Sequence, residues 1–579
     1  MTHPLLYFLS STASSQFHRL IAEERTNCRD CKTFTKKLHT YSIFEEVFVI
    51  LHQISIIMGA FINIGNAGFQ SARNGEYVDK SALIAVINET LFTENRFSCV
   101  SRCRRFGKSM AAKMLCAYYD KSCDSRSLFA DLKIAGDRTF EQHLNKYPVI
   151  YLDLTNFVTR YRDEGIIKLM DTKIKEDIHN AYTDVPLNDD DDLMDYLIRI
   201  ADTTTQRFIF IIDEWDAICR EFEPKTKIMD AYVDWLRKMF KGADAIRVFA
   251  GVYITGILPI KKYKTQSALN NFTEYSMVNP RRLAGYFGFT KPEVQALCQK
   301  YSMDFDEFEK WYDGYQLGNE RSIFNPNSVM QAINSDWCTS YWASTGAYDT
   351  VAQYIRMNYE GLKDDIIQML GGGRCKVDPT GFQNDMADIR SKSDVFTVLI
   401  HLGYLSFDRV KSECYIPNYE VAGEMVNAIK SNKWDIVADA LDKSEQLLQA
   451  VLDGDEEAVA AGVDTAHDEN TSILSYNDEN SLACVLSIAF YHAKNDYTFH
   501  RELPTGKGFA DLVLMPRKQG KNPPILLELK KDLSAGTAID QIHNKNYKGK
   551  VSQYEGQIIL VGINYDSKSK KHDCKIELL

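Results

Sequence analysis

A short basic segment has the composition of a phosphate-binding loop. The string RCRRFGKS follows the apolar run RFSCVS and leads into MAAKMLCAYYD, which has the composition of a helix. A turn between a strand and a helix points backbone N–H groups at phosphate oxygens. In such a turn Lys108 would reach the β- and γ-phosphates of a nucleotide, and the Ser109 hydroxyl would help to hold Mg²⁺. We expect ATP or GTP to bind here with Mg²⁺, against Arg105, Phe106, Gly107, Lys108, Ser109 and Met110.

Two features of this loop leave alternatives open. Arg102 occupies the position at which the standard pattern has a glycine, and the tripeptide Gly-Lys-Ser is common by chance. Arg104 and Arg105 could contact phosphate or a neighbouring subunit, or could simply pair with surface acids. A second motif is therefore needed before a nucleotide site is expected.

That second motif is an apolar run that ends in acids. RFIFIIDEWD reads as a buried strand with Asp213 and Glu214 at its carboxyl end. Asp213 would join the Mg²⁺ shell, and Glu214 would orient and polarise the attacking water. A buried strand that ends in exposed acids is the ordinary alternative. Thr255 and Gly256 end a third strand, RVFAGVYITG, either as a polar group near the γ-phosphate or as a plain strand end.

A second chemical pattern lies near the C-terminus. GKGFADLVL and ILLELKKD read as two strands, with Asp511 at the start of the first. Glu528 and Lys530 are two residues apart on the second strand and therefore share one face. Two carboxylates that meet across neighbouring strands form an oxygen site suited to Mg²⁺, and the lysine would stabilise charge that develops on a phosphate. Alternating charges on an edge strand are the ordinary alternative.

The elements that must position these groups follow an α/β pattern. Apolar runs that alternate with helical segments predict parallel strands with crossover helices in the first half of the chain. Later apolar runs predict a second, smaller α/β domain. We expect an N-terminal extension of unknown role (1–57), a P-loop domain (58–280), a mostly helical middle region (281–433), an acidic helical spacer (434–478) and a C-terminal domain (479–579).

Bulk composition restricts the class of protein. A chain of 579 residues is too long to fold around one hydrophobic core, so we expect two to four domains. A content of 45% hydrophobic and 25% charged residues is typical of globular proteins. The net charge of −11 excludes a protein that coats duplex with its whole surface, so nucleic acid would need a local basic patch. Several lysines around the C-terminal pattern form either such a patch or a solvated face: Lys530, Lys531, Lys545, Lys548 and Lys550.

Cysteine usage and one apolar stretch bear on the compartment. The 13 cysteines are irregularly spaced, which argues against a disulfide framework and favours a reducing cytoplasm. Cys28 and Cys31 have zinc-like spacing but no second pair, so two free thiols are the simpler interpretation. The stretch EEVFVILHQISIIMGAFINIGN is interrupted by polar residues, so we expect no membrane helix there.

Several ordered strings resemble one family. GFQSARNGEYVDKSALI, SRCRRFGKS, FIIDEWD, YITGILPI, WYDGY, FNPNS and YWASTG look like the AAA-ATPase-like family, in which an atypical P-loop domain often precedes a PD-(D/E)xK nuclease domain. The family loop is typically RPRRFGKS, so the missing glycine is normal for it and Cys103 replaces the usual proline. The resemblance runs from about Ile62 to the C-terminus, with the middle helices matching more loosely.

This resemblance implies a restriction-endonuclease-like fold for the C-terminal domain. It adds Glu479, on a helix before the strands, as a further metal ligand. Gln541, Lys545 and Tyr547 match a helix that family members often carry after the core. The family often has an arginine where Phe509 stands, which puts one phosphate contact in doubt.

Two classes of function fit these patterns. In the first, the chain is an enzyme in which hydrolysis of ATP or GTP gates a Mg²⁺-dependent nuclease. In the second, it is a nucleotide-dependent binding switch or scaffold whose C-terminal domain binds nucleic acid or protein without cleavage. The expected partners are a nucleotide and nucleic acid, and self-association is left open.

Overall fold

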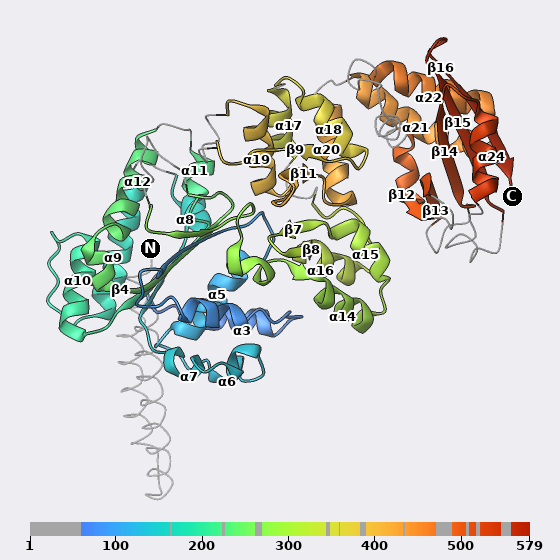
Figure 1. Cartoon of the computed structure of the whole chain (residues 1–579). Coiled ribbons are helices and arrows are strands. Elements are labelled where there is room, and N and C mark those ends of the chain that lie inside the picture. Colours follow the sequence, from blue (N-terminus) through green and yellow to red (C-terminus); the bar gives the residue numbers. More distant parts are fainter. Residues whose placement is uncertain are drawn as a thin grey trace, which may run out of the picture.

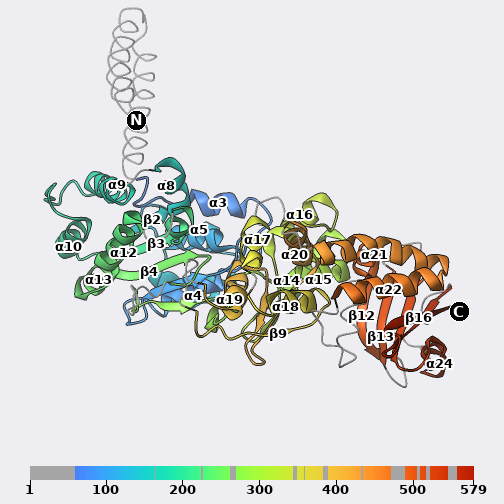
Figure 2. The same ribbon diagram turned by 90° about the horizontal axis from the view of Figure 1, so that it is seen from above.

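The computed structural model describes residues 59–579, except for 163–164, 223–225, 261–268, 343–347, 358, 383–388, 432–434, 471–488, 505–508, 517–521 and 546–556. Three parts follow one another along the molecule, with the middle region between the other two (Figure 1). The view from above gives the same order and separates the two large sheets (Figure 2). The N-terminal extension with Cys28 and Cys31 lies outside the described residues.

The N-terminal part is built on a five-stranded sheet with the order β2-β3-β4-β1-β5, in which every neighbouring pair runs parallel. The strand before the loop, β1, and the strand that carries the acids, β3, are therefore separated by β4. This confirms the predicted parallel α/β fold. The strands are β1 (Phe97–Ser101), β2 (Val149–Asp153), β3 (Phe208–Asp213), β4 (Phe249–Gly256) and β5 (Thr273–Tyr275).

Helices cover both faces of this sheet. Phe208 and Phe210 of β3 pack into a core on one face, whereas Ile209 and Ile211 pack into a core on the other. Because both faces are covered, the strand is apolar along its whole length. The helices are α3 (Ala67–Arg73), α4 (Ala82–Asn88), α5 (Lys108–Tyr119), α6 (Arg126–Phe129), α7 (Phe140–His143), α8 (Leu154–Arg160), α9 (Ile166–Ala181), α10 (Leu193–Thr204), α11 (Ala217–Glu221), α12 (Lys227–Phe240), α13 (Ala243–Val248) and the 3₁₀ helix η1 (Lys133–Gly136).

The middle region combines helices with two small sheets of three strands, in the orders β6-β8-β7 and β10-β11-β9. These strands are too short to show a clear alternating pattern in the sequence, and the prediction of a mostly helical region missed them. The elements are η2 (Arg281–Tyr286), β6 (Phe289–Thr290), α14 (Lys291–Tyr301), α15 (Phe305–Tyr312), β7 (Tyr315–Leu317), β8 (Glu320–Phe324), α16 (Pro326–Ser335), α17 (Tyr348–Arg356), α18 (Leu362–Leu370), β9 (Cys375–Lys376), α19 (Lys392–Leu402), β10 (Ser406–Asp408), β11 (Glu413–Tyr415) and α20 (Tyr419–Ser431).

The C-terminal part is a mixed sheet of five strands in the order β12-β13-β14-β15-β16. Only β14 and β15 pair in parallel; the other three pairs are antiparallel. The elements are α21 (Asp435–Asp453), α22 (Glu456–Asn470), η4 (Tyr491–Asn495), β12 (Tyr497–Pro504), β13 (Phe509–Pro516), β14 (Ile525–Lys531), α24 (Ala535–Lys545), β15 (Ile559–Asp566) and β16 (Lys571–Leu578).

Helices α21 and α22 belong to this C-terminal part. Leu447 and Val463 share one hydrophobic core with Leu512 and Leu527 of the sheet, and α22 packs on β16. The interpretation of residues 434–478 as a spacer therefore needs correction, because the acidic residues of the two helices conceal an apolar face that the sheet covers.

The cysteines that lie within the described residues are free thiols. Within the described ranges, no helix is both long and apolar enough to cross a membrane.

Candidate functional site

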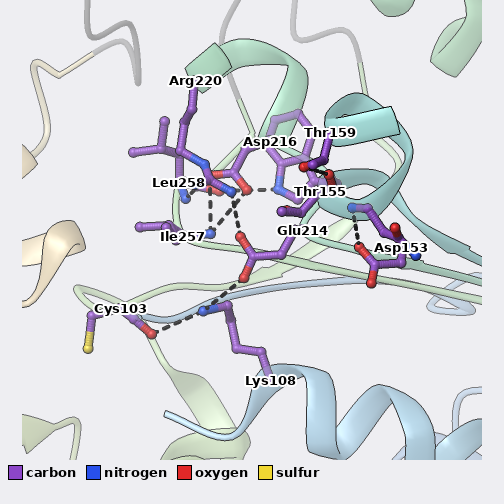
Figure 3. Close-up of polar contacts among 12 residues, drawn as sticks. Cys103, Lys108, Asp153, Thr155, Thr159, Glu214, Asp216, Arg220, Ile257 and Leu258 are labelled. Carbon is purple, nitrogen blue, oxygen red and sulfur yellow. Dashed lines mark hydrogen bonds and ion pairs between the residues drawn. The ribbon is translucent and has the colours of Figure 1, made fainter. Parts of the chain in front are cut away.

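The loop between β1 and α5 brings a buried lysine to the carboxyl edge of the sheet. Gly107 has a φ of +87°, and α5 begins directly after it at Lys108. The Lys108 ammonium donates a hydrogen bond to the Cys103 carbonyl at 3.1 Å and lies 3.5 Å from a carboxylate oxygen of Glu214 (Figure 3). The lysine is therefore held at the loop, with Glu214 as its counter-charge.

Asp213 is buried at the end of β3 and lacks part of its hydrogen bonding. Its Oδ1 accepts no hydrogen bond from the described residues, while Oδ2 accepts from the Tyr151 hydroxyl at 3.4 Å. Burial raises the pKa of Asp213 from 3.8 to about 6, and a hydrogen bond from Ser109 opposes this shift. A buried carboxylate with a free oxygen beside a hydroxyl fits a Mg²⁺ ion bound by one carboxylate, one hydroxyl, water and phosphate.

No three His, Cys, Asp or Glu side chains in the described ranges come together as a ready-made metal cage. The fit of Ser109 and Asp213 to Mg²⁺ therefore depends on phosphate oxygens from a bound nucleotide. Protein sites that use few carboxylates and complete the shell with substrate phosphates are ordinary for this ion.

An ion-pair network holds Glu214 in place. The Arg220 guanidinium lies 2.6 Å from Glu214 and 3.3 Å from Asp216. Asp216 is fully buried and accepts hydrogen bonds from the backbone N–H groups of Ile257 and Leu258, which follow β4 (Figure 3). Glu214 itself has a φ of +54°, a left-handed conformation that costs energy in a non-glycine residue.

This network was missed in the sequence. Asp216 and Arg220 are one helical turn apart in DEWDAICR, and that spacing on the segment after an acidic strand end was the available signal. Burial raises the pKa of Asp216, and the Arg220 charge opposes this shift. The two residues position Glu214 rather than face the cavity described below.

Two further polar residues lie beside Asp213 in the sheet. On the two neighbouring strands, Asp153 of β2 and Thr255 of β4 are the residues paired with Asp213. Thr255 is fully buried, and Asp153 also accepts a hydrogen bond from the Asn156 N–H at the start of α8. Thr255 is paired with Asp213 but is not part of the lining of the cavity described below, so both interpretations of this strand end stay open. Asp153 was overlooked because VIYLDLT contains a single acid, which is followed by Leu and Thr.

A cavity of about 410 Å³ opens next to the loop. Lys108, Ser109 and Glu214 are part of its lining. Further lining residues come from the segment before α4 and from the middle region: Tyr77, Val78, Lys80, Tyr286, Phe289, Asn327 and Met330. A mixture of apolar side chains and a few polar groups is the usual composition of a small-molecule site.

Arg102 explains the departure from the standard loop. Its side chain is fully buried, and its guanidinium donates to the carbonyls of Ser101 at 2.8 Å and Tyr275 at 2.7 Å. It also lies over the ring of Phe287, 5.2 Å from the centroid. Burial lowers the pKa of Arg102 to about 10. The side chain points away from the cavity and ties the loop to the segment that enters the middle region.

Phe106 and Cys103 also turn toward the middle region. Both side chains are buried in the core of that region, and the Phe106 ring packs edge-on against Tyr315 at 5.0 Å. We expected Phe106 to contact nucleotide; its side chain is buried in this core, and the residue is also part of the lining of the cavity. Met110 is 39% exposed on the cavity side of α5.

The second candidate site lies on β14. Glu528 is 1% exposed, and the Lys530 ammonium lies 3.3 Å from its Oε1. The Gln541 side chain of α24 donates a hydrogen bond to the same oxygen. The helix matched by resemblance after the core therefore reaches the predicted metal carboxylate.

The register of β13 and β14 brings the neighbours of Asp511 and Glu528 together. Leu512 pairs with Leu527 across these antiparallel strands, and Asp511 and Glu528 are the residues adjacent to this pair in the sequence. Glu479 lies outside the described residues, as do Tyr547, Lys548 and Lys550.

Comparisons with known proteins match both candidate sites. Residues 63–265 match the AAA-ATPase-like family, described as a predicted AAA-ATPase. Residues 477–574 match the PD-(D/E)XK nuclease superfamily. The chain carries an AAA-ATPase-like domain followed by a PD-(D/E)xK nuclease-like domain. The first match contains the loop and the acids of β3, and the second contains β13 and β14.

One curated relative aligns with part of the chain. It is an uncharacterized protein in the vnfD 5′ region of Azotobacter chroococcum mcd 1, with 26% identity over 294 residues. The alignment covers 49% of this chain and 54% of the relative, so the chain spans about half the length of the curated relative that it matches.

Two solved structures are also similar. AMPPCP-bound DnaA from Aquifex aeolicus has 10% identity and a TM-score of 0.23; the match covers 64% of this chain and 95% of the DnaA chain. The Aeropyrum pernix ORC2 protein in ADPNP–ADP complexes has 11% identity and a TM-score of 0.27; the match covers 62% of this chain and 96% of the ORC2 chain. These scores are too low to compare the AAA-ATPase-like domain with either structure residue by residue.

Proposed function

We propose that this protein hydrolyses ATP or GTP in its AAA-ATPase-like domain and uses the nucleotide to control a Mg²⁺-dependent nuclease in its C-terminal domain. The observation that carries the first half is the meeting of Lys108, Ser109 and Glu214 at one cavity, with the buried Asp213 behind them.

Each group has a defined task in this proposal. Backbone N–H groups at the start of α5 and the Lys108 ammonium bind the phosphates. Ser109 and Asp213 would hold Mg²⁺, which neutralises phosphate charge when bound. Glu214, held by Arg220, orients the attacking water and accepts its proton.

The nuclease half is supported by the register of β13 and β14. Asp511 and Glu528 would hold Mg²⁺, which polarises the scissile phosphate when bound, and Glu479 is a further candidate by resemblance. Lys530 would stabilise the charge that develops on the phosphate, and Gln541 positions Glu528. Lys530 and Lys531 offer local positive charge to a nucleic-acid backbone on an otherwise acidic chain.

Nucleotide binding is tested by thermal shift of the purified full chain. A ligand that binds only the folded protein raises its apparent stability in proportion to ln(1 + [L]/Kd). We expect ATP or GTP with Mg²⁺ to stabilise the wild type, at 100 times Kd by about 2.7 kcal/mol, and to leave Lys108→Ala unchanged. Lys113→Ala, five residues further along α5, is the matched control and keeps the shift. If neither nucleotide stabilises the wild type, the first half of the proposal is wrong.

A further inference from the structure

The phosphate-binding loop is anchored in the middle region by the side chains that do not face the cavity. Cys103 and Phe106 are buried in that region's core. Arg105 has a φ of +67°, and its guanidinium donates to the Tyr341 carbonyl at 2.8 Å. Arg105 also lines the cavity with Lys108, so one side chain touches both the candidate phosphate site and the middle region.

From Tyr341 the contacts continue to a buried carboxylate on α20. The Tyr341 N–H donates to Glu420 Oε1 at 2.7 Å, and the Ser328 hydroxyl donates to Oε2 at 2.8 Å. Glu420 and Ser328 are both fully buried. Burial raises the pKa of Glu420 to about 7, and Arg105 is among the groups that oppose this shift. We call Arg105, Ser328, Tyr341 and Glu420 the Glu420 cluster.

Three sequence motifs without assigned chemistry build this cluster. FNPNS supplies Ser328, and YWASTG begins with Tyr341. WYDGY contacts the segments that lead into Tyr341 and into α20. The Tyr312 hydroxyl donates to the Thr339 carbonyl at 2.9 Å and accepts from the Thr339 N–H at 3.0 Å, just before Tyr341. The Asp313 carbonyl accepts from the Asn418 side chain at 2.8 Å, just before α20.

The cluster ends on the helix that leads to the nuclease-like domain. Glu420 lies in the first turn of α20, and α21 begins four residues after α20 ends. Helix α20 packs against α21, and α21 contributes Leu447, Leu448 and Val451 to the core of the C-terminal sheet. A displacement of α20 therefore acts directly on an element of the nuclease-like domain.

We propose that Arg105 detects the terminal phosphate of the bound nucleotide and passes its presence to α20 through Tyr341 and Glu420. Arg105 keeps one N–H on the Tyr341 carbonyl and uses its remaining donors for phosphate, because a guanidinium has five N–H groups in a fixed fork. Tyr341 and Glu420 are positioning residues, and the triphosphate thereby fixes α20 in one place. This inference rests on the nucleotide binding proposed above and specifies how that site controls the nuclease-like domain.

Hydrogen exchange of the full chain tests it. The protein is measured alone, with the triphosphate that stabilises the wild type in thermal shift, and with the corresponding diphosphate. We expect amide exchange in residues 419–431 to slow about fivefold or more with triphosphate, and much less with diphosphate. In Arg105→Ala this difference disappears. Arg104→Ala, an exposed arginine one position earlier, keeps it.

A second pair of variants separates transmission from binding. Glu420→Leu removes both acceptor oxygens, so triphosphate should still bind within about threefold of the wild-type Kd but no longer slow exchange in 419–431. Glu420→Gln keeps an acceptor for the Tyr341 N–H and restores the effect.

The outcomes distinguish this inference from the proposed function. A wild type that binds triphosphate without slower exchange in 419–431 overturns the inference alone, as does an Arg105→Ala variant that keeps the full effect. A wild type that binds neither ATP nor GTP overturns the proposed function, and this is already visible in the thermal shift. Arg105 is half-exposed, so its alanine variant remains informative even if Glu420→Leu fails to fold.

Discussion

Asp213 sits in an environment that favours its neutral form over the charged form that a Mg²⁺ ligand needs. Burial accounts for most of this preference, and Glu214 adds repulsion. The folded pKa of about 6 lies above the ordinary 3.8, so the folded protein holds a proton that the unfolded chain releases. Stability from this residue is therefore present below pH 4 and is lost as the pH rises through about 6.

Asp213→Asn should consequently stabilise the protein without nucleotide while removing the metal carboxylate. A shift of two pKa units corresponds to about 3 kcal/mol at about 1.4 kcal/mol per unit. We expect the variant to melt at a higher temperature than the wild type at pH 8 and at the same temperature near pH 4. Its Mg²⁺-dependent nucleotide shift should be lost at both values. A variant less stable than the wild type at pH 8 would contradict this account of Asp213.

A substitution of Arg220 tests whether its guanidinium positions Glu214 for hydrolysis. Removing it in Arg220→Ala frees the carboxylate that should orient the attacking water, so we expect kcat for nucleotide hydrolysis to fall about 10- to 100-fold. The nucleotide Kd should change little, because Lys108 and the backbone remain. Arg162→Ala is the control, since Arg162 pairs with Glu221 on the surface nearby. Phosphate release measures both, and an unchanged kcat in Arg220→Ala would contradict the positioning role of Arg220.

Among the single residues of the nucleotide site, the sequence predicted those whose chemical identity the reaction requires. Lys108 and Glu214 could be read from their motifs, and the structure brings them within 3.5 Å. Their supports could not be read in the same way. Arg102, Asp216 and Arg220 act through backbone carbonyls, backbone N–H groups and a buried ion pair, all of which depend on which segments meet in three dimensions.

Among the elements, α21 and α22 show how composition can mislead. Their exposed faces are acidic, so the segment resembles a solvated spacer, yet Leu447, Val459 and Val463 lie in the core of the C-terminal sheet. The strands with long apolar runs, β1 to β4 and β13 to β15, were predictable because burial on both faces leaves a continuous signal. Short strands such as β6 and β9 have only two residues and leave no such signal.

The packing of α21 gives a test of where the nuclease-like domain begins. Leu447 is 5% exposed, and Leu447→Ala should lower the stability of the C-terminal domain by about 2–5 kcal/mol. Glu457→Ala, on the exposed face of α22, should change it by less than about 0.5 kcal/mol. Hydrogen exchange of β14 and β15 reports the effect on that domain. Equal behaviour of the two variants would restore the interpretation of the segment as a spacer.

For the whole molecule, the two domains predict a nuclease whose rate depends on nucleotide. Plasmid or single-stranded DNA should be cleaved with Mg²⁺, and Glu528→Ala should reduce cleavage at least about 100-fold. Lys568→Ala, an exposed lysine in the turn between β15 and β16, should retain most of it. Lys108→Ala should remove the effect of ATP or GTP on the rate. Salt-sensitive DNA binding without cleavage would instead favour the binding switch.

Arg102 limits how freely this loop could be exchanged with that of another P-loop protein. A glycine at this position would match the standard pattern, but it would remove the donor that the Ser101 and Tyr275 carbonyls share and leave a void beside Phe287. Conversely, this loop grafted onto another scaffold would bury a guanidinium with no carbonyls to receive it. The loop and the middle region therefore depend on each other through this side chain. A chimera that takes the loop from one protein and the middle region from another should fail to fold around the nucleotide site.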